Sequence, residues 1–131
     1  MTNRKNAGAA SSDKRREAYM LGLRAETLAA LRLRLTGWRI IERRFLAGGG
    51  EIDLVAIRGD CIAFVEVKAR ASVQAAAESI TPQKMQRMRR AANAWLARNP
   101  WAARKTLRAD AVFLAPRAWP RHEVNIFDLA D

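Results

Sequence analysis

The chain has 131 residues, half of them hydrophobic, which suits one packed domain and excludes a disordered chain. Its 24 Lys and Arg residues outnumber its 13 Asp and Glu residues, and the net charge of +11 favours a polyanionic partner, above all nucleic acid. The alternative is a basic surface that is only well solvated. No apolar run approaches the ~20 residues of a membrane helix, and no signal-peptide pattern follows the basic N-terminus. Because a single cysteine cannot form an internal disulfide, we expect a cytoplasmic protein with no membrane partner.

The N-terminal part is predicted to be a polar tail followed by a helix. Residues 1–12 are small and polar, so we predict a flexible tail there and a single domain over residues 13–131. From Asp13 to Leu35, apolar residues recur with helical spacing. This spacing predicts a buried stripe made of Ala18, Leu21, Ala25, Leu28 and Leu35. Gly37 suits the position just after the helix.

Three strands are predicted next, over residues 38–45, 51–57 and 61–70, with a glycine-rich loop after the first. The segment Arg58-Gly59-Asp60 separates the last two strands and suits a tight hairpin turn.

The second half of the chain adds one long helix and two strands. After a loop or short helix over residues 71–79, Thr81 followed by proline predicts the start of a helix that runs to about Arg98. Closing strands are predicted over residues 107–115 and 124–129. The order helix, three strands, helix, two strands predicts an α/β fold with a mixed sheet flanked by helices.

The strand over residues 61–70 carries charges where a buried strand should have none. Its sequence, CIAFVEVKAR, has apolar residues on both faces, which is typical of a central strand. Glu66 and Lys68 fall on the same face as Phe64. Because burying a carboxylate costs several kcal/mol unless it is paired or binds a metal, Glu66 is a candidate site residue.

The strand over residues 51–57 repeats this pattern. Strict alternation places Glu51 and Asp53 on one face, together with Val55 and Ile57. The other face then carries Ile52, Leu54 and Ala56.

The hairpin brings these carboxylates together in either of two registers. A turn centred on Gly59-Asp60 sets Asp53 opposite Glu66 and Glu51 opposite Lys68, whereas a turn shifted back by one residue sets Glu51 opposite Glu66. Carboxylates that face each other repel, and a divalent cation between them would remove that penalty. Oxygen-only ligands suit Mg²⁺ or Mn²⁺. The alternative is a salt-bridge network, in which Glu51 pairs with Lys68 and Asp53 caps a loop.

Asp53, followed thirteen residues later by Glu66-Val67-Lys68, is similar to the D…(D/E)xK pattern of the PD-(D/E)xK nuclease superfamily. That superfamily includes restriction endonucleases and archaeal Holliday-junction resolvases. Over about residues 15–128, the chain also resembles the YraN family of small bacterial proteins. This second resemblance is carried by Glu26, Gly37, Gly50-Glu51-Ile52-Asp53-Leu54, Phe64-Val65-Glu66-Val67-Lys68 and Arg108-x-Asp110.

The resemblance implies a restriction-endonuclease-like fold and assigns roles to the acidic residues. Asp53 and Glu66 are expected to bind Mg²⁺ or Mn²⁺, with the backbone carbonyl of Val67 as a further ligand. Lys68 is expected to stabilise the attacking hydroxide or the charge that develops on phosphorus. Glu51 is expected to position Lys68 or a water molecule.

Two further acidic residues receive less specific roles. Glu26 stands where related nucleases place a helix carboxylate that reaches the metal or its waters, and the alternative is an ordinary surface charge. Asp110 is expected to be structural and to pair with an arginine. The single histidine, His122, is expected at the surface or at a strand edge rather than as a ligand.

The segment from Ser79 to Ala109 is rich in basic residues and contains no acidic residue. We expect it to bind the phosphates of a nucleic acid through Lys84, Arg87, Arg90, Arg104 and Lys105.

The function implied is a metal-dependent endonuclease that hydrolyses phosphodiester bonds in nucleic acid, with DNA ahead of RNA and branched DNA among its substrates. The alternative is a non-catalytic nucleic-acid-binding module, or a subunit of a DNA repair or uptake complex, with the same fold. The resemblance also leaves a homodimer open, with Trp101 or Trp119 at its interface, against the alternative that both tryptophans pack locally.

Overall fold

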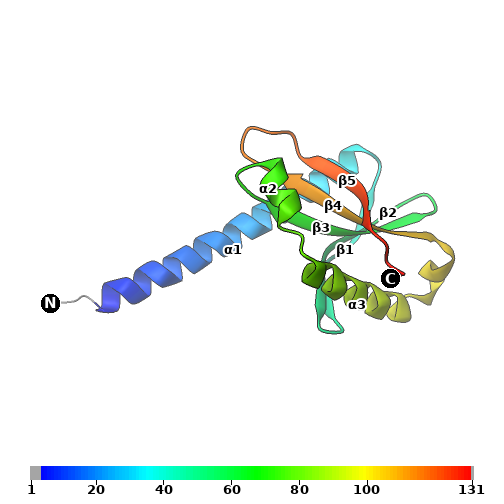
Figure 1. Cartoon of the computed structure of the whole chain (residues 1–131), viewed down its shortest axis with the longest axis horizontal. Coiled ribbons are helices and arrows are strands. Elements are labelled where there is room, and N and C mark those ends of the chain that lie inside the picture. The colour runs from blue at the N-terminus through cyan, green and yellow to red at the C-terminus, as the bar shows by residue number, and fades with distance from the viewer. Residues whose placement is uncertain (1–3, 131) are drawn as a thin grey trace.

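The computed structural model of the chain describes residues 4–130, apart from the side chains of residues 4–10, 18 and 19 (Figure 1). It confirms a mixed α/β fold, in which five strands form one sheet flanked by helices. The elements in chain order are α1 (Arg4–Leu35), β1 (Arg39–Ala47), β2 (Gly50–Arg58), β3 (Cys61–Ala69), α2 (Val73–Glu78), α3 (Pro82–Arg98), the 3₁₀-helix η1 (Pro100–Arg104), β4 (Thr106–Leu114) and β5 (Arg121–Phe127).

The strands lie in the order β1-β2-β3-β4-β5. All neighbouring pairs are antiparallel except β3 and β4, which are parallel because α2, α3 and η1 form the crossover between them. In the β2–β3 hairpin Arg58 pairs with Cys61 and Val55 pairs with Phe64. This confirms the register with Gly59-Asp60 at the turn. Gly59 has a positive φ of 57°, which glycine adopts at little cost.

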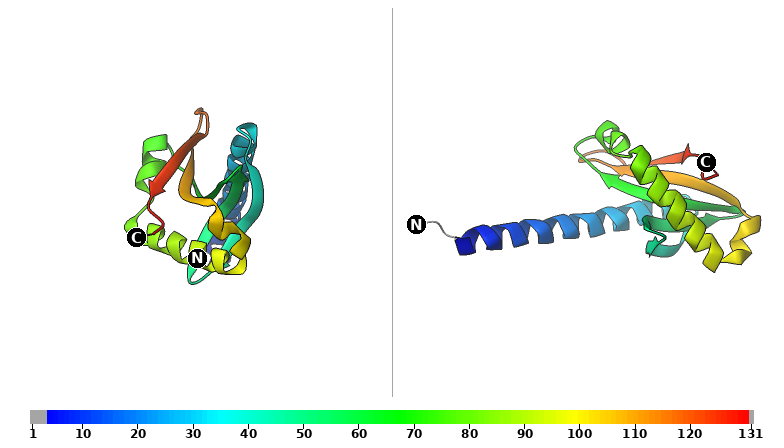
Figure 2. Two further views of the ribbon diagram at one scale, coloured as in Figure 1. Left: turned by 90° about the vertical axis from the view of Figure 1, so that its right-hand side faces the viewer. Right: turned by 60° about the horizontal axis from the view of Figure 1, so that its bottom comes forward.

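Helices cover both faces of the sheet, with α1 on one face and α2 and α3 on the other (Figures 1 and 2). On the first face, Ala29 and Leu33 of α1 pack against Leu54 and Val65. On the second face, Trp95 of α3 packs edge-on against Phe64 of β3, with ring centroids 5.5 Å apart. The central strand β3 is therefore buried on both sides, as its sequence predicts.

The N-terminus of α3 is fixed by local sequence and by a close contact with β2. The side chain of Thr81 accepts a hydrogen bond from the amide of Lys84, and Pro82 opens the helix, as predicted. A Cβ atom on Gly50 would collide with the backbone carbonyl of Arg87, so only glycine fits this position. The hairpin between β1 and β2 thus presses against α3 and fixes the start of that helix relative to β2.

Helix α1 differs most from the prediction. It begins at Arg4 rather than Asp13, so residues 4–12, predicted to be flexible, are helical. The division of the chain into a tail and a domain stays a prediction.

The stripe predicted for α1 is also wrong. Of its members, Ala25 is buried, Leu21, Leu28 and Leu35 are exposed, and the Ala18 side chain lies outside the described residues. The face packed on the sheet carries Ala25, Glu26, Ala29, Ala30 and Leu33. Two helical stripes compete in this segment, and small alanines allow the helix to approach the sheet closely.

Candidate active site

The candidate site lies where β2 and β3 separate. Their paired residues run from Arg58 and Cys61 at the turn to Leu54 and Val65. Beyond that pair, the backbone amide of Val67 donates a hydrogen bond to Oδ2 of Asp53, at 2.8 Å. A side chain thus replaces the neighbouring strand as the partner of this amide, and the two strands open around it.

The alternation of β2 breaks at the same point. Ile52 packs in the α3-side core together with Val55, although strict alternation would place these residues on opposite faces. The prediction that Ile52 shares a face with Leu54 is therefore wrong. In β1, Arg44 stands opposite Asp53 between the registered pairs and has a φ of 54°, so the neighbouring strand is also irregular at this point. A sequence pattern of period two cannot reveal such a local distortion.

Glu66 is a buried carboxylate with one oxygen paired and the other without a partner. Its side chain is 1% exposed, and Oε1 lies 3.2 Å from the Nζ atoms of both Lys68 and Lys84. Oε2 is buried and receives no hydrogen bond among the described residues. A buried carboxylate oxygen without a partner is rare, and it indicates a place for an ion or a water molecule.

Asp53 is held in an environment that disfavours its charge. Burial, together with the nearby charges of Glu66 and Glu51, raises the pKa of this carboxyl to about 8, although the Val67 amide and Lys84 act to lower it. In the absence of a cation, Asp53 is therefore largely protonated at neutral pH. A cation would restore the charge by compensating both carboxylates.

Glu51 is half-buried and lines a cavity that Asp53 and Glu66 also line. Its predicted pairing with Lys68 is not among the contacts of the described residues, because the ion pair of Lys68 is formed with Glu66. Glu51 acts on the site instead through its charge, which raises the pKa of Asp53.

Glu26 is a buried carboxylate that pairs with arginines of β1. It is 6% exposed, so it is not an ordinary surface charge. Both of its oxygens accept hydrogen bonds from Nε of Arg44, at 2.9 and 3.0 Å, and Arg43 lies 3.8 Å away. Glu26 lines the cavity that contains Asp53 and Glu66, but its carboxylate is committed to the arginines of β1. A role at a metal stays a prediction.

The donor set can be compared with the needs of a hard cation. No group of three or more His, Cys, Asp or Glu side chains converges on one point among the described residues. Asp53 and Glu66 therefore supply two carboxylates, and a third ligand has to come from the backbone or from water. In an antiparallel ladder a residue points its N–H and C=O to the same side, so the Val67 carbonyl is expected to face the same opening. Mg²⁺ accepts such a set, because it keeps several waters.

The five predicted phosphate-binding residues do not lie together. Lys84 lies in the site, on Glu66, whereas Arg87 and Arg90 are exposed on α3. Arg104 and Lys105 follow the other end of α3, about 25 Å away by helix length. Lys105 there pairs with Asp60 of the β2–β3 turn at 3.7 Å.

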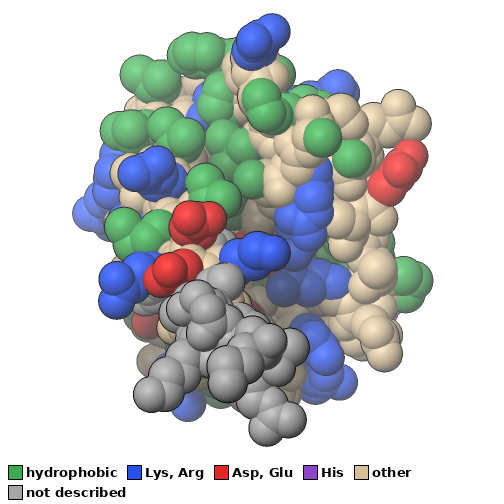
Figure 3. Space-filling model, turned by 90° about the vertical axis from the view of Figure 1, so that its left-hand side faces the viewer, with side chains coloured by type: hydrophobic (Ala, Val, Ile, Leu, Met, Phe, Trp, Pro, Cys, Tyr) green, Lys and Arg blue, Asp and Glu red, His purple; other side chains and the backbone are tan. Residues whose placement is uncertain are grey.

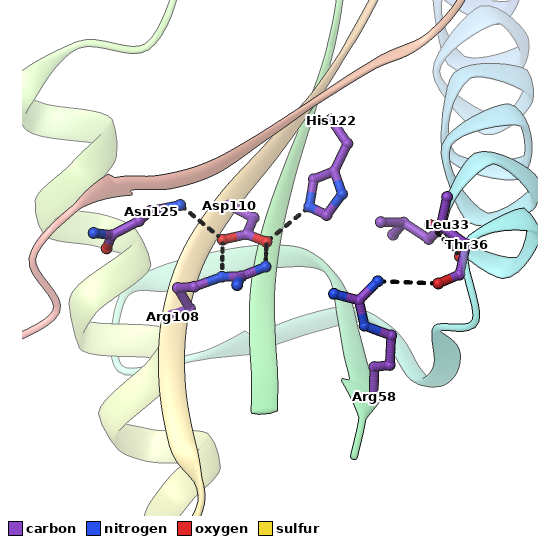
Figure 4. Close-up of polar contacts among 7 residues, drawn as sticks. All are labelled: Leu33, Thr36, Arg58, Arg108, Asp110, His122 and Asn125. Carbon is purple, nitrogen blue, oxygen red and sulfur yellow. Dashed lines mark hydrogen bonds and ion pairs between the residues drawn. The ribbon is translucent and has the colours of Figure 1, made fainter. Parts of the chain in front are cut away.

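A further buried carboxylate, Asp110 of β4, lies on the α1 side of the sheet (Figure 4). Arg108 binds both of its oxygens, at 2.9 and 2.7 Å, which confirms the expected pairing with an arginine. Nε2 of His122 lies 2.7 Å from Oδ2, and the amide of Asn125 donates to Oδ1 at 2.9 Å. His122 lies on the edge strand β5, as expected, but its side chain is 9% exposed.

The two tryptophans considered for an interface are both exposed, Trp101 by 53% and Trp119 by 72%. Trp101 also contacts Trp95 edge-on, with centroids 5.9 Å apart, so it packs in part locally. Among residues 4–130, no helix is both long and apolar enough to cross a membrane.

Comparison with known proteins places the chain among uncharacterised bacterial proteins. The model of the uncharacterised protein family UPF0102 matches residues 25–114, a segment that contains every predicted site residue. A UPF0102 protein of Methylobacterium nodulans is 60% identical over 116 residues, which cover 88% of this chain and 90% of the relative. A UPF0102 protein of Brucella canis is 51% identical over 115 residues, which cover 88% and 91%.

Proposed function

The chain belongs to the uncharacterised protein family UPF0102, which is also called the YraN family, and we propose that it is a metal-dependent endonuclease acting on nucleic acid. DNA is the proposed partner ahead of RNA, with branched DNA among the substrates, and the cytoplasm is the proposed location. A restriction-endonuclease-like fold and a relation to Holliday-junction resolvases are part of the same proposal.

One observation carries the proposal. Glu66 has a buried oxygen without a partner, next to Asp53, whose pKa is raised to about 8. Such an arrangement costs stability in the free protein, and a cation bound by both carboxylates would remove the cost. The D…ExK pattern thus coincides with a site that is electrostatically incomplete.

The chemistry of the proposed reaction is phosphodiester hydrolysis. A bound Mg²⁺ or Mn²⁺ supplies a water of lowered pKa and polarises the phosphate. Asp53 and Glu66 would hold the cation, with the Val67 carbonyl as a further ligand. Lys68 and Lys84 place two ammonium groups at the same carboxylate, and both are suited to stabilise charge that develops on the phosphate.

The test is a cleavage assay on labelled linear, flapped and branched DNA, and on RNA, with Mg²⁺, with Mn²⁺ and with EDTA. We expect cleavage with either metal and none with EDTA. Asp53→Asn, Glu66→Gln and Lys68→Ala should each lower the rate by at least about a hundredfold. Asp60→Asn, in the exposed turn at the other end of β2, is the matched control and should cleave normally.

Two outcomes would contradict the proposal. Undiminished cleavage by all three site variants would place the chemistry elsewhere, or in a contaminant. Tight binding of DNA by a well-folded protein that cleaves none of the substrates would favour the non-catalytic binding module.

A further inference from the structure

The carboxylates open into a cavity of about 970 Å³, at the upper end of the range for small-molecule sites. Three parts of the chain meet there: the middle of α1, the separated ends of β2 and β3 with the start of α3, and the segment after β4. Figure 3 views the molecule from this side, and hydrophobic side chains gather there beside Lys and Arg side chains.

The walls of the cavity differ in chemistry. One wall carries the site residues, Asp53, Glu66, Lys68 and Lys84. The apolar wall consists of Leu21 and Leu28 of α1 and Pro116, Ala118 and Pro120 of the β4–β5 connection. Arg24 and Arg70 also line the cavity and add positive charge.

The leucines of this wall are not needed for the core. Leu21 is 62% exposed and Leu28 is 51% exposed, while the opposite face of α1 packs on the sheet. Exposed apolar side chains that line a cavity with a few converging polar groups are typical of a binding site.

A nucleic acid strand presents two chemistries side by side: a phosphate, which the lysines and arginines attract, and a base, which has an apolar flat face. In a duplex that face is stacked and hidden, so only polar edges and the backbone are offered. An unpaired base can expose it and pack against apolar side chains.

We propose that the apolar wall binds an unpaired base next to a phosphate attracted by Lys68 and Lys84, so that the substrate class is single-stranded nucleic acid, including flaps and unpaired branch points. This inference rests on the proposed function. It goes further, because it assigns a base-binding role to Leu21, Leu28 and the Pro116–Pro120 segment.

The experiment compares a labelled single strand with an abasic strand of equal length, which keeps the phosphates but lacks the bases, and with a blunt duplex. Binding of the full chain is measured in EDTA, where metal-dependent hydrolysis cannot proceed. We expect the base-bearing strand to bind about tenfold more tightly than either of the others, because only its bases can pack against the apolar wall.

The matched variants are Leu28→Ser and Leu31→Ser. Both leucines lie on α1 and are almost equally exposed, at 51% and 49%, but Leu31 does not line the cavity. Leu28→Ser should lose most of the preference for the base-bearing strand and leave binding of the abasic strand unchanged, whereas Leu31→Ser should behave like the unaltered chain.

Equal affinity for the base-bearing and abasic strands would overturn the inference, as would equal effects of the two serine variants. Cleavage with Mg²⁺ is measured in parallel and separates the two proposals. Without cleavage of any substrate, the nuclease proposal fails, while the abasic comparison still decides whether the wall binds a base.

Discussion

The centres at the buried carboxylates Asp110 and Glu66 differ in how well their oxygens are satisfied. At Asp110 each oxygen receives a hydrogen bond from Arg108, and His122 and the Asn125 amide add one contact each. At Glu66 two lysines share a single oxygen, and the other oxygen has no partner among the described residues.

The pKa values of the two centres move in opposite directions. Burial acts to raise the pKa of Asp110, but hydrogen bonds from His122, Arg108 and the Asn125 amide outweigh it, and the pKa is lowered. Burial and the charge of Glu66 raise the pKa of Asp53 to about 8. Burial alone therefore does not identify a functional carboxylate. A centre whose partners are complete serves the fold, and one whose partners are missing is suited to bind something else.

The largest effect is expected from removing the satisfied carboxylate. Asp110→Ala leaves the Arg108 guanidinium and the Asn125 amide without their partner and should lower the free energy of unfolding by about 3–5 kcal/mol. Glu66→Gln removes the ion pairs with Lys68 and Lys84 but also the charge that disfavours an ionised Asp53, so it should change the stability of the metal-free protein much less. Urea unfolding in EDTA measures both, and equal losses would show that the two centres are energetically alike.

The second effect is stabilisation by a cation at the unsatisfied centre. Mn²⁺ at about a hundred times its dissociation constant should raise the free energy of unfolding by about 2.7 kcal/mol. Glu66→Gln should abolish this gain, whereas Glu123→Gln, which alters a carboxylate on β5 paired with Arg121, should keep it. Thermal unfolding with and without Mn²⁺ measures the difference. A gain that survives in Glu66→Gln would place the cation elsewhere.

The third effect is an opposite pH dependence of the two centres in the metal-free protein. Because the pKa of Asp53 is raised from 3.8 to about 8, its contribution to stability is full below about pH 4 and is lost as the pH rises through 8. The pKa of Asp110 is lowered, so its contribution is present above about pH 4 and is lost as the pH falls through the folded-state value.

Asp53→Asn should therefore remove a downward slope in stability between pH 5 and 8, of at most about 1.4 kcal/mol per pH unit for one proton. Asp60→Asn, an exposed aspartate, should leave the slope unchanged. Urea unfolding in EDTA across this range tests the sign. A stability that rises with pH and is unaffected by Asp53→Asn would contradict the raised pKa.

Much of the site follows from the sequence because it depends on strand pairing. A turn centred on Gly59-Asp60 predicts that Asp53 and Glu66 lie near each other, and the observed register has that turn, although the paired residues end at Leu54 and Val65. The partners of Asp110 show the limit of this reasoning. Arg108 is two residues away in the same strand, but His122 and Asn125 arrive from β5, and a bulge in the β4–β5 pairing sets their approach.

Lys84 and Glu26 show what a linear pattern leaves out. Lys84 lies in an acid-free segment and was predicted to bind phosphate. It lies at Glu66 because the fold packs α3 closely on Gly50 of β2, and the linear sequence does not show that packing. Glu26 is buried against Arg44 because α1 packs through its alanines and Leu33 rather than through Leu21 and Leu28. The positions of both side chains depend on which helix face packs on the sheet. In α1 the spacing of apolar residues is compatible with two different buried faces.

The smallest effect is expected from Lys84, whose ammonium group contacts its carboxylate at one oxygen, in contrast to Arg108 at the other centre. Arg108 is bound at two points to Asp110, whereas Lys84 shares one oxygen of Glu66 with Lys68, at 3.2 Å each. A cation that binds Glu66 has to approach these positive charges, so Lys84→Met should remove repulsion and tighten Mn²⁺ binding by up to about tenfold, or ~1.4 kcal/mol. Lys68 remains to pair with Glu66, so the fold should be retained. Calorimetric titration with Mn²⁺ measures the change, and Lys105→Met, which breaks only the surface pair with Asp60, is the matched control. Weaker binding in Lys84→Met would mean that Lys84 holds the carboxylate in place for the cation rather than competing with it.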